Sequence, residues 1–161
     1  MQDLPNTATE LDYLRRQQYR AGWQDLLDIM ISGIAENASD EDRRQFLNLM
    51  GNRLAGRFPL AQAETVGDLE DQLNRLWSDF HWGFVRLHPG ETHLILTHHA
   101  FPAAAPGAQE QRQQWNDGLA AILEGAYAEW LLAQGGQPHV PLRWLPDGAE
   151  GVMTFSYQNG I

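Results

Sequence analysis

Cysteine and lysine are both absent from this 161-residue chain. Without cysteine there is no disulfide, no thiol nucleophile and no thiolate metal site. Every basic residue is an arginine, and 11 of them stand against 21 acidic residues, for a formal net charge of −10. Because so acidic a chain repels nucleic acid and anionic membranes at long range, we expect neither as a partner.

Long apolar runs are also missing. Hydrophobic residues make up 43% of the chain, which is typical of a globular protein. Polar residues nevertheless interrupt every apolar stretch well before the roughly 20 residues that a membrane-spanning helix needs. The first ten residues lack the basic start and apolar run of a secretory signal. We therefore expect a cytoplasmic protein without membrane insertion, with the periplasm as second choice.

The apolar pattern predicts one α+β domain. Residues 1–9 are polar and contain one proline, which predicts a flexible tail before a single domain at 10–161. Helices are predicted at 11–35, 40–56, 66–80 and 111–134, and two β-hairpins have strands at 82–87, 93–98, 139–145 and 151–157. The order ααα-ββ-α-ββ predicts a mainly antiparallel four-stranded sheet with helices covering one face.

Local signals support these helices. Ser39 and Thr65 are each followed three residues later by an aspartate, as at a helix N-cap. The residues expected to face the core in the first two helices are Trp23, Leu26, Leu27, Met30, Ile34, Phe46, Leu47, Met50 and Leu54. The tryptophans expected in the core are Trp23, Trp77, Trp115 and Trp130.

The first predicted hairpin is rich in histidine: His88, His93, His98 and His99 lie within it or at its ends. A metal site needs three or four converging ligands, and the chain has no helical His-x-x-x-His pattern. We interpret these four as ordinary surface or strand-end histidines. An enzyme that uses this hairpin remains an alternative, and it requires metal binding or turnover.

Other catalytic patterns have no match in the chain. It contains no G-x-S-x-G nucleophile elbow and no glycine-rich phosphate loop, so we expect neither a catalytic residue nor a cofactor. Glu124 stands out because it lies in an apolar stretch of the long helix. A lone carboxylate there predicts an ion pair with an arginine or an accepted hydrogen bond.

A stripe of small residues follows the same long helix, formed by Gly118, Ala121, Gly125 and Ala128. Two glycines inside a helix cost about 1 kcal/mol each relative to alanine, so a close approach of another backbone should offset them. Two partners are open at this point. The stripe packs against the sheet of its own chain, or it forms an interface between subunits.

Three stretches carry residues in an order and spacing that are similar to a known family. They are Leu69, Asn74, Trp82, Gly83, Val85 and Leu87 in 65–87; Leu123, Glu124, Gly125, Tyr127 and Trp130 in 123–136; and Leu47, Gly51, Arg57 and Pro59 in 43–59. Pro102 also fits. Together they resemble the D subunit of bacterial cellulose synthase complexes, from about residue 22 onward. Residues 103–112 and Ala126, where a larger apolar residue is common, depart from the pattern.

The resemblance implies a non-catalytic protomer that dimerises and assembles into a ring-like octamer. Such a ring would guide nascent glucan chains or organise the synthase complexes. The implied partners are copies of itself, the synthase complex, and nascent glucan or a Pro-rich accessory protein. Since N-terminal helical segments are associated with the interior passages of the family, the candidate contacts are Tyr13, Arg15, Arg16, Gln17, Gln18 and Tyr19. The alternative is a cytoplasmic scaffold that binds protein partners only and never contacts glucan.

Overall fold

A computed structural model describes residues 20–104, 108–138, 140–146 and 151–158. It contains α2 (Trp23–Asn37), α3 (Asp40–Arg57), α4 (Val66–Phe80), β1 (Phe84–Pro89), β2 (His93–His99), α5 (Gln109–Ala133), β3 (Leu142–Leu145) and β4 (Val152–Gln158). The predicted α+β class and the order of elements are confirmed. Within the described residues, no helix has the length and apolar character needed to cross a bilayer.

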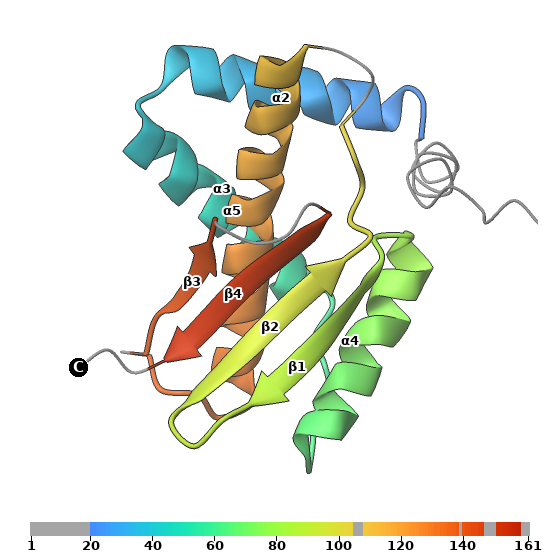
Figure 1. The fold of residues 1–161 in the computed structure, drawn as a ribbon, viewed down its shortest axis with the longest axis vertical. Helices are drawn as coiled ribbons and strands as arrows, with labels where there is room; N and C mark the ends of the chain where they lie inside the picture. Colours follow the sequence, from blue (N-terminus) through green and yellow to red (C-terminus); the bar gives the residue numbers. More distant parts are fainter. Residues whose placement is uncertain (1–19, 105–107, 139, 147–150, 159–161) are drawn as a thin grey trace, which may run out of the picture.

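The four strands form one antiparallel sheet in the order β1-β2-β4-β3. Helix α5 lies behind the sheet and α4 runs beside β1, so the helices lie on one side and the other face of the sheet is open (Figure 1). The third strand begins at Leu142, later than the sequence predicted, since Pro141 has no N–H to donate to a ladder. The open face consists of the strand residues that point away from α5.

The predicted N-caps are confirmed. Ser39 Oγ accepts a hydrogen bond from the Asp42 amide at 3.1 Å, and Thr65 Oγ1 accepts one from the Asp68 amide at 3.0 Å. Each bond satisfies one of the free amides of the first helical turn. The two caps therefore fix the starts of α3 and α4, which are the helices that meet α5 and β1.

Both edges of the sheet are closed by side chains from helices. On the β1 edge, the Asn74 amide group accepts from the Val85 N–H at 2.7 Å and donates to the Val85 carbonyl at 3.0 Å. On the same edge, Glu70 accepts from the Leu87 N–H at 2.8 Å. On the β3 edge, Glu124 accepts from the Trp144 N–H at 2.7 Å. These groups take the positions that a neighbouring strand would occupy, so they discourage pairing with another chain.

An aromatic cluster fills the space between α4, α5 and the sheet. Trp77 is fully buried at its centre. Its ring contacts Phe80, Trp82, His98, Tyr127 and Trp130 with centroid distances between 5.0 and 6.0 Å. Trp115 is also buried, with its indole N–H donating to the Pro102 carbonyl at 2.7 Å. Three of the four tryptophans expected in the core are therefore there.

The fourth, Trp23, is 81% exposed, and the predicted inward face of α2 is wrong at Trp23, Leu26 and Met30 but right at Leu27, which packs against the core. The helix buries Gln24 and Ile31 instead, while Leu26 and Met30 are exposed. Gln24 donates a side-chain hydrogen bond to the Ala103 carbonyl, which holds Gln24 inward. The buried positions Gln24 and Ile31 are thus each one residue after the predicted Trp23 and Met30.

Helix α3 shows the same kind of shift. Leu47 is buried as predicted, but the other buried residues are Gly51 and Ala55, whereas Phe46 is 46% exposed. Small residues replace the predicted bulky ones at the centre of this face because α3 packs closely on α5. A β-carbon at Gly51 would collide with the backbone of Ile122.

Candidate interaction surfaces

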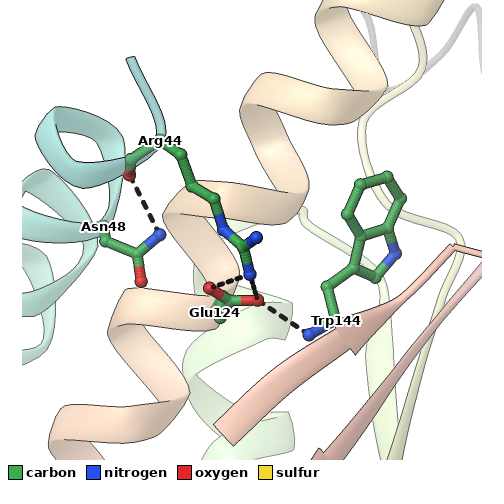
Figure 2. Close-up of polar contacts among 4 residues, drawn as sticks. All are labelled: Arg44, Asn48, Glu124 and Trp144. Carbon is green, nitrogen blue, oxygen red and sulfur yellow. Dashed lines mark hydrogen bonds and ion pairs between the residues drawn. The ribbon is translucent and has the colours of Figure 1, made fainter. Parts of the chain in front are cut away.

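Glu124 of α5 joins three elements. Its carboxylate is nearly buried and accepts hydrogen bonds from Arg44 Nη2 of α3 at 3.0 Å to both oxygens, as well as from the Trp144 N–H of β3. Figure 2 shows the Arg44 guanidinium and the Trp144 main-chain nitrogen converging on this carboxylate, with the Trp144 indole directed away from it. The prediction that Glu124 pairs with an arginine or accepts a hydrogen bond is confirmed, since it does both.

A cleft of about 350 Å³ opens beside this junction. Its lining residues are Asp40, Glu41, Arg43, Arg44, Gln113, Asp117, Ala121, Glu124, Trp144 and Pro146. Four carboxyl groups against two guanidinium groups disfavour an anion. A half-buried indole beside planar hydrogen-bonding groups instead suits a neutral, hydroxyl-rich ligand.

His98 lies near the end of β2, as expected of a strand-end histidine, but it is fully buried, so its interpretation as a surface residue is wrong. Its Nε2–H donates to the Trp82 carbonyl at 2.7 Å, and its Nδ1 accepts from the Tyr127 hydroxyl. Burial lowers the pKa of His98 to about 4. The hydrogen bond to the Trp82 carbonyl raises this pKa, but by less than burial lowers it. Burial also raises the pKa of Tyr127. Both groups are therefore neutral at pH 7, and each is used to bind α5 to the sheet.

The other three histidines of this hairpin lie on the open face. His88 Nε2 and His99 Nε2 both lie within hydrogen-bonding distance of Thr97 Oγ1, at 3.1 and 3.0 Å. Burial, and then the charges of Arg86 and His88, lower the pKa of His99. In the part of the chain that the structure describes, no group of three His, Cys, Asp or Glu side chains has metal-binding geometry.

An apolar surface of α2 faces outward. It consists of Trp23, Leu26, Ile29 and Met30, which are 81%, 49%, 67% and 54% exposed, and we call it the α2 patch. Trp23 also borders a hollow of about 190 Å³ that is lined mainly by aromatic and aliphatic side chains, together with Arg20, Gln24 and His81. Sequence reasoning found these apolar residues but assigned most of them to the core, because periodicity does not distinguish a core face from an interface face.

The small-residue stripe of α5 packs within its own chain. A β-carbon at Gly125 would collide with the Asn48 backbone of α3, and one at Gly118 would come within 2.7 Å of Ile31 Cγ2 of α2. Ala121 is buried beside the cleft, and Ala128 is half-buried. The close approach that the glycines require is thus made by helices of the same chain. A subunit interface on this stripe stays a prediction.

The predicted glucan or partner contacts lie outside the described residues. They are Tyr13, Arg15, Arg16, Gln17, Gln18 and Tyr19. The structure therefore places none of them.

Comparison with known proteins identifies relatives of one kind. The family model of the cellulose synthase D subunit matches residues 9–158. Cellulose synthase operon protein D of Komagataeibacter xylinus and the protein of the same name from Komagataeibacter sucrofermentans are each 32% identical over 105 residues. These matches span 64% of this chain and 65% of each relative, slightly under two thirds of the relatives' length.

The fold also occurs in a solved structure of distant sequence. Subunit 3 of the trafficking protein particle complex from Naegleria fowleri, described as covalently bound to palmitic acid, aligns with a TM-score of 0.50. The alignment covers 85% of this chain and 98% of the other at 10% identity. At that identity the likeness concerns the fold alone.

Proposed function

Because this chain belongs to the cellulose synthase D-subunit family, we propose that it is a non-catalytic accessory component of bacterial cellulose synthesis and secretion. It assembles from dimers into a ring-like homo-octamer in the cytoplasm and associates with the synthase complex. The assembly organises synthase complexes or guides glucan chains, so that cellulose is deposited in order.

The exposed α2 patch is the observation that best supports self-assembly. A largely exposed tryptophan on a helix, next to three further exposed apolar side chains, is typical of a protein interface. The adjacent aromatic hollow offers a pocket for an apolar side chain of a second copy. A helix-to-helix contact through this patch buries all of these groups in one step.

The closed sheet edges support the same mode of assembly. Asn74 and Glu70 occupy the free N–H groups of β1, and Glu124 occupies that of Trp144 in β3. Addition of a strand from another copy would have to displace these side chains. Helical surfaces are therefore the better candidates for contacts between copies.

A non-catalytic role agrees with how the buried polar groups are used. Glu124, His98 and Tyr127 are each held in hydrogen bonds between elements of the fold. A general acid or base must reach a substrate, and these groups face protein partners instead. They support the fold rather than a reaction.

Guidance of glucan and a scaffold role make different demands on the chain. Guidance requires contact with sugar, for which the cleft beside Trp144 and the N-terminal residues Tyr13 and Tyr19 are the candidates. The alternative scaffold, which binds protein partners only, needs no sugar contact. Titration with soluble cellopentaose distinguishes them: binding that is lost in Trp144→Ala or Tyr13→Ala favours guidance, and absence of binding to the wild-type assembly favours the scaffold.

The role in cellulose synthesis is tested in a cellulose-producing bacterium that lacks its own D subunit. The wild-type chain should restore the yield and order of the cellulose, whereas Ile29→Glu, which places a charge in the α2 patch, should restore neither. Glu36→Lys, an exposed change toward the C-terminal end of α2, is the control and should complement fully. Complementation by Ile29→Glu at wild-type level would contradict assembly through this patch.

A further inference from the structure

The open face of the sheet carries a charge opposite to that of the rest of the chain. No Asp or Glu occurs in any of the four strands, although the chain has 21 acidic residues. The strand register places Arg86, His88, His93, His99 and Arg143 on the open face, since they alternate with the buried Val85, Leu87, Leu96, His98 and Leu142. Two permanent cations and three imidazoles therefore share one surface of a strongly acidic protein.

Apolar and hydroxyl groups separate these cations. Phe84 is 38% exposed and Leu145 is 42% exposed, at the two edges of the face. Thr97 and Thr154 are paired across β2 and β4 between them. Interface cores in proteins are enriched in arginine and aromatic residues and depleted in Lys, Glu and Asp, and this face has that composition.

Arg86 is oriented for binding. Its guanidinium carbon lies 5.5 Å from the centroid of the Phe84 ring, and that ring stacks on His99 with centroids 4.9 Å apart. Within the part of the chain that the structure describes, neither Arg86 nor Arg143 has a carboxylate within ion-pair distance. Arg44, in contrast, is paired with Glu124. Among the described residues, no carboxylate therefore competes with an acidic group from outside for these two arginines.

We propose that the open face docks an acidic, extended segment of a partner protein, with carboxylates on Arg86 and Arg143 and an apolar side chain beside Phe84. The two arginines lie on opposite edge strands, three strand spacings apart, which corresponds to about 15 Å. An extended peptide covers that distance with about five residues. The segment crosses the face and does not extend the sheet, because Asn74, Glu70 and Glu124 close the sheet edges.

The number of positive charges on the open face and the net charge of the chain disfavour the two other polyanionic partners, an anionic membrane and nucleic acid. A membrane surface calls for a cluster of four or more permanent cations, and the face has two. Nucleic acid binding needs several phosphate contacts and is opposed by the net charge of −10. A short protein segment with two or three carboxylates requires only two cations beside an apolar group, and the open face has Arg86, Arg143 and Phe84. The inference is independent of self-assembly, which uses the α2 patch.

The test is fluorescence anisotropy of a dye-labelled octapeptide in which pairs of Glu alternate with single Phe, measured with the full chain at low salt. The wild-type chain should bind it, and a peptide with Gln in place of Glu should bind at least tenfold more weakly. Arg86→Gln combined with Arg143→Gln should weaken binding at least tenfold. Arg53→Gln combined with Arg75→Gln, which removes two exposed arginines elsewhere, should leave the affinity within twofold.

Four results would overturn the proposal. The first is absence of binding to the wild-type chain. The second is an equal loss in both double variants, which would show an effect of net charge alone. The third is a fall in oligomer mass in the Arg86 and Arg143 double variant, which would assign the face to a second copy. Tighter binding of single-stranded RNA or of anionic lipid vesicles than of the peptide would also replace the protein segment as the ligand. Thermal unfolding confirms that each variant is folded.

Discussion

Gly51 of α3 and Gly125 of α5 play matching roles where these two helices cross, because each lies against the backbone of the other helix. A β-carbon on Gly51 would meet the Ile122 carbonyl of α5, and one on Gly125 would meet the Asn48 carbonyl of α3. Each glycine thus makes room for the backbone of the other helix. The crossing holds α3 at the distance at which Arg44 reaches Glu124.

Gly125→Ala should lower the free energy of unfolding by about 2 kcal/mol, because a collision with backbone outweighs the better helix propensity of alanine. Gly56→Ala is the matched control, on the same helix as Gly51 and with nothing within 4 Å of the added methyl group. It should be neutral or stabilise by up to about 1 kcal/mol. Urea unfolding measures both, and equal effects would contradict the close crossing.

The ion pair of Arg44 and Glu124 should show measurable coupling. Glu124→Gln retains the shape but loses the charge, and with Arg44→Gln and the double variant it forms a thermodynamic cycle. We expect a coupling energy of about 1 kcal/mol, reduced by the half-exposed Arg44. The pair of Arg43 and Asp40, 3.8 Å apart with Asp40 almost fully exposed, is the control and should show no measurable coupling.

His98 should make the protein less stable in mild acid. Its pKa is about 4 in the folded state and near 6.5 in the unfolded chain, so the unfolded state binds the extra proton between these values. Stability should therefore fall by about 2 kcal/mol between pH 7.5 and pH 5 from this group alone. His98→Gln retains a donor and an acceptor but does not titrate. Urea unfolding of the two proteins should show a smaller loss in the variant, and parallel losses would exclude His98 as the cause.

Binding of the acidic octapeptide to the open face should strengthen as the pH falls from 7.5 to 5.5. The titratable and charged groups on that face are His88, His93, His99, Arg86 and Arg143, with Glu91 in the turn between β1 and β2. Because the pKa of His99 is lowered, its imidazole gains a positive charge below the usual range of histidine. Anisotropy titrations at several pH values measure the effect. His99→Gln should flatten it, and a pH dependence that survives this change undiminished would contradict the assignment.

The sequence predicted the elements well because their signals are local. N-cap residues, helical spacing and hairpin turns act within a few positions, so Ser39 and Thr65 were enough to locate two helix starts. The buried position of His98 was also accessible, since Leu94 and Leu96 precede it on the same strand face. Its interpretation as a surface residue gave more weight to the clustering of histidines than to this alternation.

Contacts between distant segments could not be predicted from a single sequence. The partner of Glu124 was predicted as an arginine, but the choice of Arg44, 80 residues away, depends on how α3 crosses α5. The orientation of α2 depends on the contact of Ile31 with Gly118 and on the bond from Gln24 to Ala103. Apolar residues of an interface obey the same helical period as those of a core, which is why the α2 patch was placed inward.

Assembly through the α2 patch is the central claim, and the absolute mass of the purified full chain by multi-angle light scattering tests it most directly. At micromolar concentration the wild-type chain should have a mass several times the 18.2 kDa of one chain, with eight copies as the expected ring. Ile29→Glu should shift the mass down toward 18.2 kDa while far-UV circular dichroism stays unchanged. A wild-type monomer, or an Ile29→Glu variant with wild-type mass, would contradict the account.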